Sequence, residues 1–167
     1  MFDLSRASAL ALVGLPATTP AVAAALDGQV LGAGAPIANA TVTLWQAGSG
    51  APRQLAQARS GADGRFALAA PDAPLGDGTL YLIARGGALA ARAAGGDNPA
   101  IALMTVLGAK APARVTINEL TTIASVFTHA QFIDGSAIKG APLQLKIAAG
   151  NVHNFVDVAS GGWGQAI

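Results

Sequence analysis

The sequence is poor in several kinds of residue, and each shortage excludes a class of protein. None of its 167 residues is cysteine, which excludes disulfides, thiolate metal sites and a lipid-modified N-terminal cysteine. Charged residues make up only 11%, the formal net charge is +1, and the basic residues are scattered singly, so no nucleic-acid partner is expected. No stretch reaches the roughly 18 uncharged apolar residues of a transmembrane helix, so the chain is not expected to span a membrane.

Aromatic residues are also few, at 5%, although 52% of the residues are hydrophobic. Alanine supplies much of that hydrophobic fraction and buries little area per residue. The core must therefore come from a limited set of Val, Leu, Ile and Phe. The length suits one ordinary domain, or one small domain with a helical appendage.

Residues 1–25 have the layout of a cleavable export signal. The apolar run Ala7–Ala17 is too short to cross a bilayer, prolines follow it, and Ala-Val-Ala at 21–23 offers a cleavage site. Because Arg6 is offset by Asp3, a disordered alanine-rich N-terminus or a misplaced start codon are the alternatives. We predict cleavage after Ala23 or shortly beyond it, and export to the periplasm, the cell surface or the medium.

Residues 26–108 alternate between short apolar runs and clusters of turn residues. The runs lie at 25–32, 36–46, 53–60, 65–70, 79–87 and 100–108. Turn signals every 8 to 12 residues or so, with β-branched and aromatic residues between them, indicate a β-sandwich. The alternation predicts a buried set made of Val30, Val42, Leu44, Phe66, Leu68, Leu80 and Leu82.

Residues 60–66, Ser-Gly-Ala-Asp-Gly-Arg-Phe, form the most turn-like stretch. A calcium loop needs several oxygen ligands at alternate positions, and Asp63 is the only acid here. A phosphate-binding loop opens a helix, whereas the residues after Gly64 alternate like a strand. We therefore predict a hairpin turn in which Gly64 takes a positive φ.

Three segments of this half share the motifs of a known family: Gly28–Val30 (Gly-Gln-Val), Pro36–Val42 (Pro-Ile-Ala-Asn-Ala-Thr-Val) and Ser60–Phe66, with Ser-Gly where Thr-Asp is usual. Over residues 26–90 the chain resembles the carboxypeptidase regulatory-like domain. The resemblance implies a transthyretin-like, Ig-like antiparallel β-sandwich, and Asn39 suits its left-handed position. Because this domain is appended to many unrelated exported proteins, the resemblance says little about function.

Residues 109–167 change to a helical period. Thr116 and Glu119 stand at capping-box spacing before a first helix that Gly135 ends, and its predicted apolar face is Ile117, Leu120, Ile123, Ala124, Phe127 and Ala130. A second helix is predicted from Pro142 to before Gly161, with an apolar side of Leu143, Ile147, Val152, Phe155, Val156 and Ala159.

The predicted fold class is therefore mainly β with an α appendage, an antiparallel β-sandwich (26–108) followed by two helices (109–167). The helical segment is also similar to one that follows such sandwiches in large exported bacterial proteins, and the Gly-rich end favours a chain that continues past Ile167.

Few residues suggest chemistry. His153 and Asp157 stand four apart on a predicted helix and could share a metal with His129, but two ligands are not a site, and a solvated polar pair is the alternative. A Gly-x-Ser-x-Gly nucleophile motif is absent. We assign no catalytic, cofactor-binding or metal-binding residue and expect no cofactor.

These observations favour an exported, non-enzymatic structural, adhesion-type or accessory module of a larger bacterial protein. Its partners would be other domains of a longer chain or an extracellular polymer. A carbohydrate- or peptide-binding sandwich is the alternative, and an exposed Trp45 beside Tyr81 in a groove would favour it. A metal-dependent hydrolase fragment is the third hypothesis, and it requires three converging metal ligands.

Overall fold

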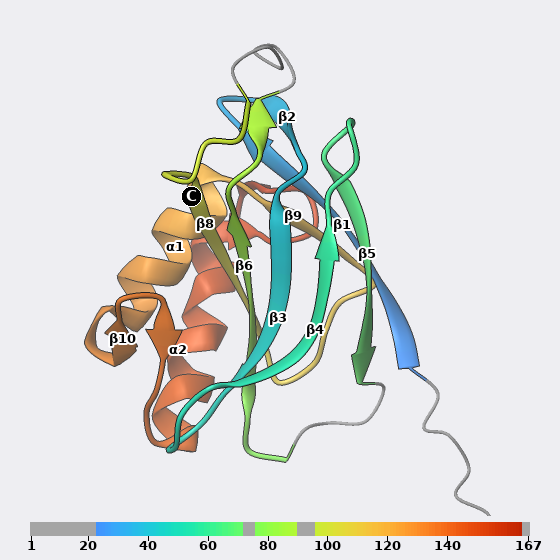
Figure 1. Ribbon diagram of the computed structural model, residues 1–167. Coiled ribbons are helices and arrows are strands. Elements are labelled where there is room, and N and C mark those ends of the chain that lie inside the picture. Colours follow the sequence, from blue (N-terminus) through green and yellow to red (C-terminus); the bar gives the residue numbers. More distant parts are fainter. Residues whose placement is uncertain (1–22, 72–75, 90–95, 165–167) are drawn as a thin grey trace, which may run out of the picture.

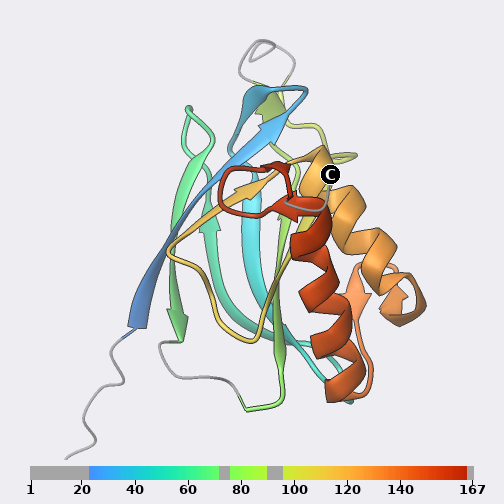
Figure 2. The same ribbon diagram turned by 180° about the vertical axis from the view of Figure 1, so that it is seen from behind.

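The structure is a computed structural model that describes residues 23–71, 76–89 and 96–164. Residues 1–22, which hold most of the expected export signal, lie outside the described part. Two β-sheets face each other, and two helices pack side by side on the outer face of one sheet, near its β8 edge (Figures 1 and 2). No helix among the described residues is long and apolar enough to cross a membrane.

The first sheet has the strand order β5-β1-β2-β7, and β9 pairs with β1. The second has the order β4-β3-β6-β8. All neighbours are antiparallel except β1 and β9, which run parallel. The first sheet comprises β1 (Ala23–Gly32), β2 (Ala35–Ala38), β5 (Arg65–Pro71), β7 (Ala88–Leu89) and β9 (Arg114–Ile117). The second sheet comprises β3 (Thr41–Ala47), β4 (Arg53–Arg59), β6 (Thr79–Arg85) and β8 (Ala102–Gly108).

The helices are α1 (Glu119–His129), which continues into the 3₁₀ turn η2 (Ala130–Phe132), and α2 (Pro142–Phe155). Two short hairpins flank them: β10 (Ile133–Asp134) with β11 (Ala137–Ile138), and β12 (Val156–Asp157) with β13 (Gly162–Trp163). The predicted fold class, an antiparallel β-sandwich followed by two helices, is confirmed.

The core between the two sheets is the predicted one. All seven predicted residues are buried, and the most exposed of them, Phe66, exposes only 6% of its surface. They alternate with exposed neighbours along β5, because successive side chains of a strand point to opposite faces. Strand β6 is buried on both faces, since Leu80 and Leu82 face the other sheet while Tyr81 and Ile83 belong to a second core under the helices.

The turn at residues 60–64 has the predicted backbone but a different role. Gly64 has φ 74°, as expected, and a Cβ there would lie 2.5 Å from the Val30 carbonyl oxygen. However, β4 pairs with β3 and β5 pairs with β1, so the turn carries the chain from one sheet to the other. The predicted hairpin is wrong. Asn39, between β2 and β3, does take the left-handed conformation, with φ 59°.

The first helix begins later than predicted. Residues 114–117 form β9, with Val30 opposite Ile117, so the sandwich continues past residue 108. Asn118 caps α1 instead of Thr116: its side chain accepts from the Thr121 amide, and the Thr121 hydroxyl accepts from the Asn118 amide, both at 2.9 Å. The second helix ends at Phe155.

The inward face of α1 is also not the predicted one. Thr121, Ser125 and His129 are buried together with Ala124, whereas Ile123 and Phe127 expose 64% and 70% of their surfaces. In α2 the predicted Leu143 and Ile147 are likewise exposed, while Leu145, Ala148, Ala149 and Val152 are buried.

The edge of strand β8 explains the orientation of α1. The outer backbone amides of an edge strand need hydrogen-bond partners once they are covered. Met104 N donates to Thr122 Oγ1 and Val106 N donates to Ser125 Oγ, each at 2.9 Å. The hydroxyls of α1 therefore take the place of a neighbouring strand, and the apolar side chains of the helix are turned outward.

Candidate functional site

The two histidines lie in different environments. His129 is fully buried between α1 and α2, whereas His153 is exposed near the end of α2. Asp157 lies beyond the helix in β12, and its carboxylate accepts from Ala159 N and Ser160 Oγ at 2.9 and 2.8 Å. Nowhere in residues 23–71, 76–89 or 96–164 do three metal-capable side chains gather.

His129 is held by its own helix. Its Nδ1 lies 3.1 Å from the Ser125 carbonyl oxygen, which can only accept, so Nδ1 carries the proton. Among the described residues Nε2 has no hydrogen-bond partner. Burial lowers the pKa of His129, and the carbonyls of Ser125 and Leu145 partly offset this effect. His129 thus lies among packed side chains, with its ring edge to face with that of Phe132.

Trp45 and Tyr81 are neighbours but do not form a platform. They face each other across β3 and β6, yet Tyr81 exposes only 1% of its surface. The Tyr81 hydroxyl accepts from Ile138 N at 3.4 Å, and burial raises the pKa of its phenol. Trp45 is half-buried against the second core. Because no exposed aromatic pair lies here, the feature expected of a sugar-binding groove is missing at this position.

Glu119 has a role that the sequence did not reveal. Its carboxylate accepts from the Ala33 amide at 2.6 Å, at the turn between β1 and β2, where Ala33 has φ 49°. This contact ties the start of α1 to the first sheet. The residue is structural, although not as the predicted helix cap.

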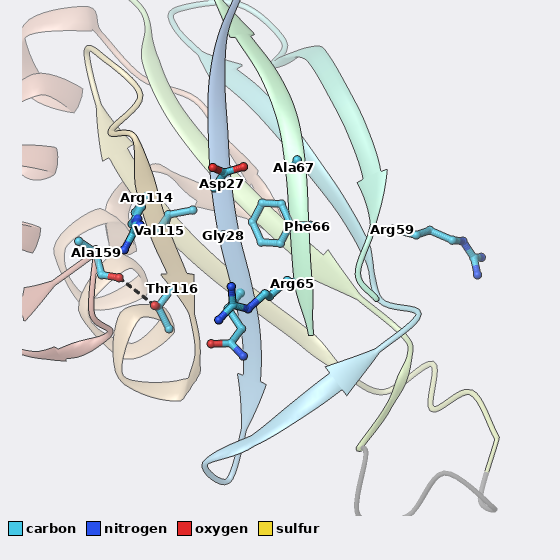
Figure 3. A pocket seen from close by; sticks show the side chains of 11 residues that line it. Asp27, Gly28, Arg59, Arg65, Phe66, Ala67, Arg114, Val115, Thr116 and Ala159 are labelled. Atoms are coloured by element: carbon cyan, nitrogen blue, oxygen red, sulfur yellow. Dashed lines mark hydrogen bonds between the residues drawn. The ribbon is translucent and has the colours of Figure 1, made fainter. Parts of the chain in front are cut away.

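A polar hollow of about 790 Å³ lies on the outer surface of the first sheet, across β5, β1 and β9 (Figure 3). Strand pairing brings Arg65 and Thr116 to either side of Gln29, and Ala67 and Arg114 to either side of Asp27. Because β9 joins β1 from far along the sequence, periodicity alone could not reveal this grouping.

The groups in the hollow are mostly engaged in structure. Arg65 pairs with Asp63 at 3.5 Å, and the Thr116 hydroxyl donates to the Ala159 carbonyl at 2.9 Å. Figure 3 shows Arg59 pointing away from the other side chains. Arg114 has no ion-pair partner in the described part of the chain, so it could hold an anionic group. The lining of the hollow offers the charged side chains of Asp27, Arg65 and Arg114.

The most unusual surface lies on the helices. Six large apolar side chains are exposed on α1 and α2, and we call them the apolar helical face: Ile123, Val126, Phe127, Leu143, Ile147 and Phe155. The rings of Phe127 and Phe155 meet edge to face, 5.6 Å apart, and so join the two helices. A signal for this arrangement was present in the sequence, as hydroxyl residues recur at 121, 122, 125 and 128, on the opposite side of α1.

Comparison with known proteins adds little to this picture. No protein-family model matches the chain, and no curated protein matches it. Among solved structures it is similar to a 9R-lipoxygenase from Cyanothece PCC8801, with 17% identity and a TM-score of 0.34. The match covers 65% of this chain but only 18% of the lipoxygenase, and at this TM-score the likeness supports no inference about function.

Proposed function

We propose that the chain is an exported, non-enzymatic accessory module of a larger assembly, which holds another protein surface against its helices. The observation that carries this proposal is the apolar helical face. Both helices direct large apolar side chains to solvent, Phe127 and Phe155 join the two sets, and exposed apolar surface of this kind marks interaction sites.

The state of the polar groups supports a non-enzymatic role. The hydroxyls of Thr122 and Ser125 pair with backbone amides of β8, and the Glu119 carboxylate pairs with the Ala33 amide. These side chains serve as structural hydrogen-bond partners. A nucleophile or a general base would instead stand free in a recess next to its partner group.

Export is supported by the sequence of residues 1–25. The short apolar run and the Ala-Val-Ala triplet have the layout of a cleaved signal. Strand β1 begins at Ala23, so cleavage after Ala23 keeps Ala24 and its pairing with Ala70.

A binding module is the second candidate, and Arg114 is the observation that favours it. Its guanidinium lies in the hollow across β5, β1 and β9 and suits a carboxylate or sulfate on an extracellular polymer or peptide. Asp27 on the same surface weakens that preference, because a like charge opposes an anionic ligand.

One labelling experiment tests both parts of the proposal, because the chain has no cysteine of its own. Single cysteines are introduced as Val126→Cys on the apolar helical face and Ala69→Cys on the exposed surface of β5, outside the hollow. Intact cells producing each variant are treated with a maleimide that cannot cross the inner membrane.

We expect the Ala69→Cys variant to be labelled in cells, because an exported chain is accessible. The Val126→Cys variant should be protected in cells and labelled once the protein is unfolded. Absence of label on Ala69→Cys would contradict export. Equal labelling of the two native variants would contradict a covered helical face.

A further inference from the structure

The apolar helical face follows from the way α1 is anchored. Thr122 and Ser125 must face β8 to pair with the amides of Met104 and Val106. Ile123 and Phe127, on the other side of the helix, therefore cannot turn into the core without breaking those bonds. Their exposure is built into the fold, and it calls for a partner outside the chain that the structure describes.

The face is as large as the largest apolar patch of a typical monomer. Each of its six side chains exposes more than a third of its surface, which together leaves on the order of several hundred Å² of apolar area. The largest patch on a typical monomer is roughly 300–600 Å² and is often functional. A standard protein–protein interface takes about 800 Å² from each partner, so this face supplies most of the area that one needs.

The charge pattern disfavours a lipid surface. Helices that lie on membranes carry Lys and Arg beside their apolar side chains, to meet anionic headgroups. From Leu120 to Ile133 there is no Lys, Arg, Asp or Glu at all. The one Lys of α2, Lys146, lies 2.8 Å from Asp77 in an ion pair. The occupant of the face is therefore a protein surface.

The same pattern fits a second copy of this chain. In a two-fold contact each residue faces its own equivalent or a close neighbour, so a charged patch would repel itself. The outer side of α1 is uncharged through Ile123, Val126 and Phe127, and the edge-to-face pair of Phe127 and Phe155 offers a broad ring surface for packing. We propose that the chain forms a two-fold dimer in which the helices of two copies pack face to face, with a sandwich on either side.

This proposal rests on the proposed function in one respect, the use of the helical face as a contact surface. It adds the identity of the partner. Phe127 would be the anchor of the contact, because aromatic side chains near the centre of an interface carry most of its affinity.

Sedimentation velocity of the purified full chain over a range of concentrations tests the dimer. We expect dimers at micromolar concentration. The variant Ile123→Glu with Phe127→Glu should weaken association by roughly 30-fold or more, because each copy would bring two buried negative charges. The matched control Ala67→Glu with Ala69→Glu adds the same charge to exposed positions of β5 and should remain dimeric.

A second measurement covers the case in which the double glutamate variant does not fold. Val126→Cys places one thiol on the face of a chain that has none. A short bis-maleimide should join two copies of this variant and leave Ala67→Cys uncrosslinked at the same concentration. A wild-type chain that stays monomeric, or a dimer that neither the Glu substitutions nor the position of the thiol affects, would overturn the proposal.

These results are separate from those of the labelling in cells. A monomer in solution that is exported and protected at Val126→Cys contradicts the dimer alone, since another protein then covers the face. A dimer in a chain that never leaves the cytoplasm contradicts the export alone.

Discussion

The sandwich and the helical layer of this protein are built by opposite rules. Between the sheets the inward side chains are mostly apolar, Thr105 of β8 being an exception, and the strands satisfy one another's backbone groups. Under α1 the inward side chains include hydroxyls beside Ala124 and His129, and two of these hydroxyls satisfy the edge of β8. The sandwich is thus held mainly by buried apolar area, whereas α1 is oriented by its hydrogen bonds to β8 and leaves its largest apolar side chains exposed.

The largest effect is expected from separating the two regions. Residues 114–161 as an isolated peptide should be largely unfolded. Helices α1 and α2 have 11 and 14 residues, and helices shorter than about 12–15 residues are marginal in water. Circular dichroism of the peptide checks this. A strong helix signal with a cooperative melt would mean that the helices form a domain of their own.

Two phenylalanines allow a direct comparison of the regions. Phe66 is buried against Gly28, and Phe66→Ala should lower the free energy of unfolding by roughly 3–5 kcal/mol, because the lost ring leaves a cavity. Phe127→Ala, the matched change on α1, should cost less than about 1 kcal/mol in dilute solution, as surface substitutions usually do. Urea denaturation gives both values, and similar losses would show that the face of α1 is misassigned.

Removing the Ser125 hydroxyl should lower the free energy of unfolding less than removing the Phe66 ring does, but more than an ordinary surface substitution. Ser125→Ala leaves the Val106 amide buried without its acceptor, which should cost about 1–3 kcal/mol. Thr128→Ala is the control, because the Thr128 hydroxyl donates to the Ala124 carbonyl of its own helix and should matter less. If both variants unfold at the wild-type urea concentration, the hydrogen bonds to β8 do not hold α1.

The smallest effect concerns pH. Burial lowers the pKa of His129, so the unfolded chain binds a proton more readily than the folded one. Stability is then complete above the unfolded-state pKa of about 6.5 and falls as the pH drops below it, by at most about 1.4 kcal/mol per pH unit for one proton. The pKa of Asp157 is also lowered, but an aspartate titrates near pH 4 or below and leaves this window unaffected.

Denaturation of wild type and His129→Gln between pH 7.5 and 5 or so measures this dependence. His129→Gln should lose most of the change of unfolding free energy with pH in that range. His153→Gln, at an exposed position, should keep that change. A wild-type stability that does not change across the window would contradict a buried neutral His129.

The sequence was sufficient for the sandwich and insufficient for its helical side. Alternation along β5 and β3 identifies Phe66, Val42 and Leu44 as core, because each strand has one face between the sheets. The αL conformation of Asn39 follows from its local chemistry in the same way. Strand alternation and a left-handed residue both depend on residues close by in the chain, so a single sequence is enough to predict them.

The largest errors involve partners that are distant along the chain. Ile117 has the spacing of a helix residue but joins β1 as part of β9, and no local signal reveals a parallel partner nearly 90 residues away. The rule that an amphipathic helix buries its apolar side predicts that Ile123 and Phe127 of α1 face inward. The rule fails here because the edge of β8 needs hydroxyl partners. The grouping of Arg65 and Arg114 across β1 has the same long-range origin.

Amide hydrogen exchange at Met104 and Val106 tests the central claim most directly, since these two amides point away from β6 and are bound only by the hydroxyls of α1. We predict that both exchange as slowly as the paired amides of β6 in the native chain. In the Ser125→Ala variant the Val106 amide should lose that protection while Met104, bound to Thr122, keeps most of it. Rapid exchange of both amides in the native chain would show that α1 does not close the edge of β8, and the outward direction of its apolar face would lose its explanation.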